Sequence, residues 1–225
     1  MTEVLSGVFF VLGSLMRKNF DRINVAKQIN EAAKLYKQHL VGKRFMYVFD
    51  TRYIEVLFKA ENFRHLTGVD TYLSAKGFYN YATKGILEAS QIRFSISHPY
   101  DLCVRKIKHI GSIATIAVSE CFMLEEIKTD TMSYKFGTTD LNFTLCLNKD
   151  YDNGIEKGDS YVVQSLRDED CFSKSETAYT VTHIFSCGTD EKRYKELLYI
   201  DKSASMDDLP DCVKEKLTPS LLSKN

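Results

Sequence analysis

The stretch KRFMYVFDTRYIEVLFKA, residues 43–60, is the starting point for interpreting the whole chain. It contains two runs of aromatic and β-branched residues, with Asp50 and Thr51 between them. Such runs favour β-strands, and a short polar interruption is typical of a hairpin turn. We therefore predict a β-hairpin here, and the flanking sequence indicates what packs on it.

Apolar residues recur with helical spacing on both sides of this hairpin. Before it, the spacing predicts a helix from about Asp21 to Val41, with Asp21 as its N-cap. The apolar face of that helix comprises Val25, Ile29, Ala32, Ala33, Tyr36 and Leu40. After the hairpin, residues 71–84 predict a second helix that ends before Gly85, and Pro99 begins a third that extends to Ile110.

The second half of the chain has the alternation typical of strands, separated by Gly, Asp and Asn turns. The strand-like segments are residues 114–126, 133–148, 160–168 and 178–187, and RYKELLYID, residues 193–201, is either a last helix or a last strand. The pattern predicts an α+β fold, with a helical layer packed on a mainly antiparallel β-sheet and an appended N-terminal helix. We predict a helical segment over residues 1–42, one domain over residues 43–201, and a loosely held polar tail over residues 202–225.

Composition restricts the kind of partner. The 30 basic and 30 acidic residues cancel, so no field of one sign directs the protein toward nucleic acid or an anionic membrane, and any RNA contact must be local. Six cysteines without a C-x-x-C pair indicate reduced thiols in the cytoplasm rather than zinc sites or disulfides. The apolar run Gly7–Met16 follows Glu3 rather than positive charge, so we expect a short buried helix or strand there. No run reaches the roughly 20 residues that span a bilayer, so no membrane association is expected.

Standard catalytic and cofactor motifs are absent from the sequence. It contains no G-x-S-x-G, P-loop, H-E-x-x-H or G-x-G-x-x-G pattern, and its five histidines show no metal-ligand spacing with one another or with cysteine. We therefore predict neither a metal site nor a cofactor.

The segment FKAENFRHLTGV, residues 58–69, is the strongest candidate for a site. Phe63 and Leu66 would anchor the backbone in the core, so His65 between them would point in a fixed direction. The free pKa of histidine lies nearest neutrality, which suits general acid or base catalysis. Lys59 and Arg64 could supply positive charge toward an anionic substrate. From the residues alone, a hydrogen-bonded structural role for His65 stays open.

Residues 54–81, IEVLFKAENFRHLTGVDTYLSAKGFYNY, resemble the opening motif of a nuclease family. This is the fourth subgroup of the phage-borne nucleases that are similar to barnase, EndoU, colicins and RelE. YVVQSL, YTVTHIF and RYKELLY resemble later strands of the family, so the similarity covers roughly Lys43–Asp201. The resemblance implies a toxin-like, metal-independent ribonuclease of phage or mobile-element origin. It also implies a catalytic role for His65, with Lys59, Thr67 and Ser165 as its neighbours.

Cleavage of this kind needs two proton-transfer groups and at least one cation. A base removes the proton from a ribose 2′-hydroxyl, the oxygen attacks phosphorus, and an acid protonates the departing 5′-oxygen. His65 can be one of the two groups, and His183 or Tyr79 the other. Arg64, Arg93 and Lys106 are the candidates for binding the phosphate.

A second hypothesis is a non-catalytic binding module that occupies a host protein or an RNA. Tyr and Phe are abundant, but these side chains serve a core as readily as they stack on bases. The two hypotheses differ in one structural feature: a nuclease requires His65 to face a cleft with a second ionisable group. The partners expected are an RNA substrate and an immunity or host protein.

Overall fold

The computed structural model describes residues 2–152 and 154–223, with the side chains of residues 2–20 and 152 outside that description. Helix α1, Thr2–His39, ends two residues before the predicted helix does and extends it toward the N-terminus. The N-cap prediction at Asp21 is therefore wrong, because that residue lies inside a continuous helix. The predicted apolar face is confirmed, since all six of its residues are buried. Gly7–Met16 falls within α1, and the predicted burial of its side chains lies outside the description.

The predicted hairpin is confirmed as β1, Lys43–Phe49, paired antiparallel with β2, Arg52–Leu57. Strand β1 is buried on both faces, which explains why its sequence is almost continuously apolar. One face contributes Phe45, Tyr47 and Phe49 to the main core, together with the helices. The other face contributes Met46 and Val48 to a second core.

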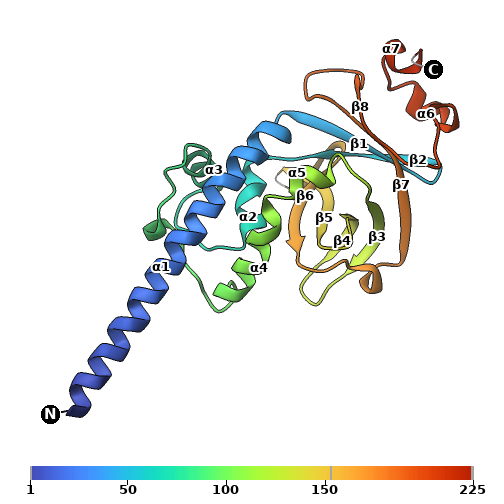
Figure 1. The fold of residues 1–225 in the computed structure, drawn as a ribbon. Coiled ribbons are helices and arrows are strands. Elements are labelled where there is room, and N and C mark those ends of the chain that lie inside the picture. The colour runs from blue at the N-terminus through green and yellow to red at the C-terminus, as the bar shows by residue number, and fades with distance from the viewer. Residues whose placement is uncertain (1, 153, 224–225) are drawn as a thin grey trace.

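A layer of helices follows the hairpin and packs on one side of the sheet (Figure 1). Its elements are η1 Ala60–Asn62, α2 Phe63–Thr67, α3 Ala75–Thr83, η2 Ala89–Gln91, α4 Tyr100–Ile110 and α5 Ile113–Ile116. The predicted helices appear as α3 and α4. Helix α3 begins later than expected, because the Ser74 hydroxyl accepts a hydrogen bond from the backbone N–H of Gly77 and so caps it. The strand predicted from residue 114 is wrong at its start, where Ile113 and Ile116 form a helical turn buried in the core.

Six further strands complete the sheet, which is antiparallel except for the β2–β6 pair. They are β3 Phe122–Lys128, β4 Ser133–Thr139, β5 Thr144–Asp152, β6 Ile155–Arg167, β7 Thr177–Gly188 and β8 Glu196–Ile200, and η3 Phe172–Lys174 precedes β7. The order is β1-β2-β6-β5-β4-β3-β7-β8, and β7 also pairs with β1. Seven strands therefore form a closed circuit, with β8 added outside β7 (Figure 1).

The C-terminal segment is held against the sheet, so the prediction of a loosely held tail is wrong. It contains η4 Met206–Asp208, α6 Asp211–Lys214 and α7 Pro219–Leu222. Four apolar residues spaced four apart in this mostly polar segment pack on the second core. These residues are Leu209, Val213, Leu217 and Leu221.

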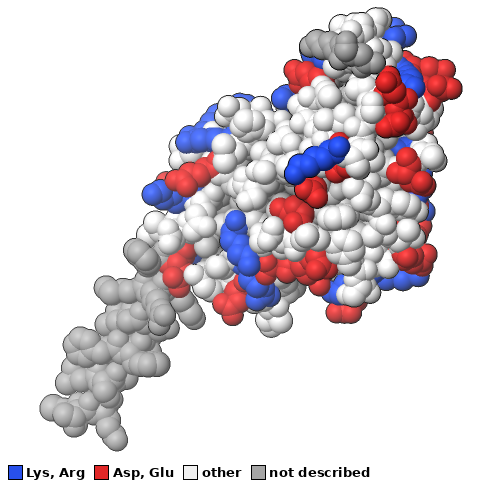
Figure 2. Space-filling model, turned by 45° about the vertical axis from the view of Figure 1, so that its right-hand side comes forward, with Lys and Arg blue, Asp and Glu red and all other residues white. Residues whose placement is uncertain are grey.

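Figure 2 shows one face of the molecule, on which basic and acidic side chains are interspersed, in agreement with the net charge of zero. In the described part of the chain, no helix combines the length and the apolar character needed to cross a membrane.

Candidate active site

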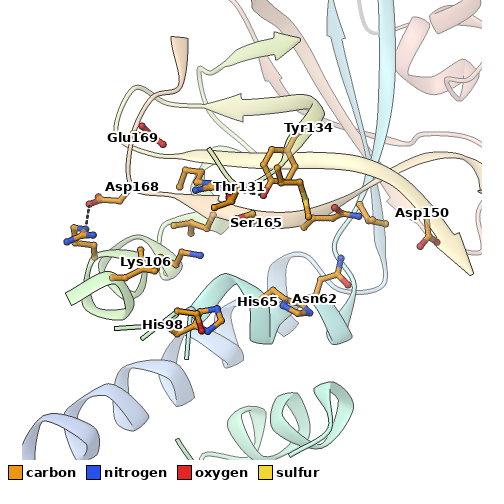
Figure 3. A pocket seen from close by; sticks show the side chains of 18 of the residues that line it. Asn62, His65, His98, Lys106, Thr131, Tyr134, Asp150, Ser165, Asp168 and Glu169 are labelled. Atoms are coloured by element: carbon orange, nitrogen blue, oxygen red, sulfur yellow. Dashed lines mark hydrogen bonds and ion pairs between the residues drawn. The ribbon is translucent and has the colours of Figure 1, made fainter. Parts of the chain in front are cut away.

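A cavity of about 850 Å³ opens between the helical layer and the sheet. Its walls come from α2 and α4 on one side and from β5, β6 and the β3–β4 turn on the other (Figure 3). Three of the residues predicted from sequence line it together: His65, Lys106 and Ser165.

His65 is oriented by the short helix α2. Phe63 and Leu66 are fully buried on the inner side of this helix, as predicted, and His65 lies on its exposed side at the cavity. The imidazole has no hydrogen-bond partner within residues 2–152 and 154–223, so both ring nitrogens are available to a ligand. Partial burial lowers the pKa of His65, and the charges of Arg64, Lys106 and His98 lower it further. The ring is therefore neutral at neutral pH and can accept a proton.

Asn62 fixes the start of α2 relative to the sheet. Its side-chain Nδ2 donates a hydrogen bond of 2.7 Å to the backbone oxygen of Val163 in β6. In Figure 3 the side chain of Asn62 lies beside His65. This contact holds the helix that carries His65 against the strand that carries Ser165.

Lys106 enters the same cavity from α4, and Figure 3 shows its amine in the space between α4 and β6. The side chain is half-buried, and within the described residues it forms neither an ion pair nor a hydrogen bond. Burial lowers the pKa of Lys106, and the nearby charge of Arg167 lowers it further. An ammonium in this state is a better proton donor than an exposed lysine.

Gly68 makes room for the Lys106 side chain. This glycine ends α2 in the left-handed conformation, with φ 70°, and a Cβ added to it would lie 2.8 Å from Cδ of Lys106. The aliphatic part of the Lys106 side chain passes close to Gly68. Both the left-handed backbone and this contact therefore favour glycine at the position.

Arg167 is a cavity residue that the sequence analysis missed. Its Nη2 donates hydrogen bonds to the hydroxyls of Thr131, at 2.9 Å, and Thr129, at 3.1 Å, in the β3–β4 turn. These partners are neutral, and no carboxylate among the described side chains contacts the guanidinium. A signal was present, because alternation along a strand places Arg167 on the same face as Ser165, two residues earlier.

The carboxylates that line the cavity are paired with cations. Asp150 forms an ion pair with Lys59, which does not itself line the cavity. Glu169 contacts Lys174 at 2.7 Å. Because these acids are neutralised, Lys106 and Arg167 give the centre of the cavity a local positive potential.

Asp168 is the most heavily paired of these acids. Burial alone would raise the pKa of Asp168, but hydrogen bonds from Lys108 and His109 outweigh it and hold that pKa below its usual value. Arg105 approaches the same carboxylate at 3.5 Å. Asp168 therefore anchors α4 to the end of β6 as an ionised group.

Besides Lys59 and His183, four predicted site residues lie outside the cavity lining. The Thr67 side chain is buried, and its hydroxyl donates to the backbone oxygen of Arg64 at 2.7 Å, so it stabilises the end of α2. Arg64 itself is directed toward the backbone oxygen of Leu73, at 3.4 Å. Tyr79 packs in the core, and exposed Arg93 lies over the Tyr72 ring. We expected these four residues to gather at the His65 cavity, and none of them lines it.

His183 lies in a different part of the molecule. It is buried in β7, where its ring stacks on Phe185 at a centroid distance of 5.8 Å. Burial lowers its pKa. His183 is therefore not a second proton-transfer group beside His65, and Lys106 is the candidate that the geometry offers instead.

The cavity thus combines a neutral imidazole, an ammonium, a guanidinium and the Ser165 hydroxyl, which together can transfer protons and stabilise a phosphate. Within the described residues, no group of three or more His, Cys, Asp or Glu side chains is arranged to hold a metal ion.

A comparison with protein families finds a match over residues 28–203, to a family described as phage-Barnase-EndoU-ColicinE5/D-RelE like nuclease4. The matched region contains every element that lines the cavity, and it begins within α1. Neither the curated proteins nor the solved structures include a match.

Proposed function

The chain belongs to the phage-Barnase-EndoU-ColicinE5/D-RelE like nuclease4 family, and on that premise we propose that it is a metal-independent RNA endonuclease. Membership supports nuclease activity in general. The finer proposal rests on one observation: His65 faces a cavity that also contains Lys106 and Arg167. This is the feature that separates the nuclease hypothesis from the binding-module hypothesis, and it favours the nuclease.

The proposed reaction begins with proton transfer to His65. Its neutral imidazole accepts the proton of a ribose 2′-hydroxyl, and the resulting oxygen attacks the adjacent phosphorus. Arg167 and the Ser165 hydroxyl donate hydrogen bonds to the non-bridging oxygens, where negative charge develops. Lys106 gives a proton to the departing 5′-oxygen, which its lowered pKa favours. The products are a 2′,3′-cyclic phosphate and a free 5′-hydroxyl.

The biological setting is part of the same proposal. The family description names phage nucleases, which supports an origin in a phage or mobile element. A ribonuclease of this origin would act as a toxin in the cytoplasm, where RNA is available, and an immunity or host protein would restrain it.

The test is cleavage of mixed RNA species by the purified chain in the presence of EDTA. We expect cleavage products that end in 2′,3′-cyclic phosphate, and no cleavage of strands that lack the 2′-hydroxyl. His65→Ala should lower the rate by roughly 10²–10⁴-fold, the usual contribution of a positioned proton-transfer group. His39→Ala, at an exposed histidine near the end of α1, is the matched control and should retain the wild-type rate. Failure of the wild-type chain to cut any RNA would favour the binding module.

A further inference from the structure

We propose that Met132, Tyr151 and Ile96 form a rim around the cavity that takes up unpaired bases, so that the cavity accepts single-stranded RNA and rejects duplex. The inference rests on the proposed function, and it specifies which RNA can reach His65.

The first side of the rim lies on the sheet. Met132 and Tyr151 both line the cavity, yet their residues are 51% and 57% exposed. Met132 precedes β4 and Tyr151 stands near the end of β5, so both lie at the same end of this antiparallel pair. Apolar side chains with this exposure, beside a cavity that contains cations, are suited to a ligand with both charged and flat apolar parts.

The second side of the rim lies before α4. Ile96 is fully exposed, and the next two residues, Ser97 and His98, line the cavity. The loop is held in shape by the Ser95 hydroxyl, which accepts a hydrogen bond of 3.2 Å from the backbone N–H of His98 and lies 3.1 Å from the Ser97 hydroxyl. The apolar side chain of Ile96 is thus presented to solvent by an ordered loop.

Nucleic acid chemistry fits this arrangement of charges and apolar groups. Phosphate contacts set position, whereas stacking on aromatic and apolar side chains requires bases whose faces are free. Lys106 and Arg167 would hold the phosphate inside, and Tyr151 and Met132 would then contact the bases beside it. A cavity of about 850 Å³ has the size of a small-molecule site, so we expect it to admit unpaired nucleotides more readily than a duplex.

Fluorescence gives a direct test, because the chain contains no tryptophan. Tyr151→Trp places a single reporter on the rim, and Tyr81→Trp places one on the exposed side of α3, away from the cavity lining. The probe is a 2′-O-methyl oligonucleotide, which lacks the attacking hydroxyl and stays intact. We expect the single strand to quench the rim reporter and leave the α3 reporter unchanged, and the same strand annealed to its complement to quench neither.

Affinity for the same probe gives a second measurement on the otherwise unmodified chain. Tyr151→Ala should weaken binding of the single strand by about 5- to 150-fold, the range for loss of one stacked base, and Tyr151→Phe should preserve it. Equal binding of single strand and duplex, or an unchanged affinity of Tyr151→Ala, would overturn the proposal. Absence of any binding by the wild-type chain would also overturn it.

The two proposals fail in different ways. A chain that binds the single strand through Tyr151 but cuts no RNA would disprove the nuclease and keep the rim. A chain that cuts RNA with equal rates on single strand and duplex, and is indifferent to Tyr151→Ala, would disprove the rim alone.

Discussion

Gly68→Ala should impair the proposed nuclease more than it destabilises the fold. Gly68 has φ 70°, a conformation that costs an alanine about 1–2 kcal/mol. For a chain of this size that cost corresponds to a fall in Tm of about 2–8 °C. The new methyl group would also lie 2.8 Å from Cδ of Lys106, so the lysine side chain must move. A displacement on the order of 1 Å can lower a rate by about 10²-fold.

Gly42→Ala provides a matched control for the backbone effect. Gly42 has φ 82°, and an added Cβ would meet no atom within 4 Å. Both variants should therefore lose similar stability, and only Gly68→Ala should lose activity. The assay is thermal unfolding and EDTA-resistant RNA cleavage on the same preparations, with the rate expressed per folded molecule. Equal activity of the two variants would show that the position of Lys106 is not important for cleavage.

Three further outcomes are expected. The cleavage rate should rise with pH, with a midpoint below the ordinary histidine pKa of 6.5, because burial and neighbouring cations lower the pKa of His65; a midpoint above that value would contradict its role as the base. Burial also lowers the pKa of His183, so below pH 6.5 the unfolded chain binds more protons than the folded chain, and the free energy of unfolding falls as the pH drops. Urea unfolding at about pH 7.5 and about pH 5.5 should show a smaller fall for His183→Gln than for the wild type. An equal fall would show that other groups cause the pH dependence. Leu217→Ala, at a fully buried position, should lower the free energy of unfolding by about 2–5 kcal/mol, whereas Leu222→Ala, at an exposed position, should change it little. Equal effects of the two substitutions would indicate that the C-terminal segment is not packed on the sheet.

Local sequence patterns predicted the individual helices and strands better than they predicted how the strands pair into a closed sheet. The buried face of α1 and the β1–β2 hairpin were predictable because periodicity and β-propensity act within a few residues. Pairing of β1 with β7 joins residues as distant as Arg44 and Cys187, and no local signal specifies it. The C-terminal segment was misjudged for another reason: its polar composition concealed four apolar residues spaced four apart.

The candidate site shows the same limit. Phe63 and Leu66 predicted the direction of His65, because two buried residues three apart on a helix leave the residue between them on the outward side. The sequence could not show that the Lys106 side chain would pass over Gly68, because that contact depends on packing between α2 and α4. The Thr67 hydroxyl was expected at the site, but it bonds within α2, to the backbone oxygen of Arg64. Arg167 could have been predicted, because strand alternation places it on the same face as Ser165. His183, by contrast, has an imidazole suited to proton transfer but is buried in β7. That burial depends on the complete sheet and could not be read from the sequence of the strand.

The closed circuit of strands has a consequence for the folding of the chain during its synthesis. Residues that line the cavity fall between Asn62 and Glu169, whereas β7, which closes the circuit through β1, begins at Thr177. The chain therefore carries all of its proposed chemical groups before it carries the strand that completes the structure around them. Contacts between residues so far apart in sequence form slowly, because a long loop must first be closed. A nascent or truncated chain that ends before Thr177 would lack the closing strand, so its sheet would stay open although every residue that lines the cavity is present.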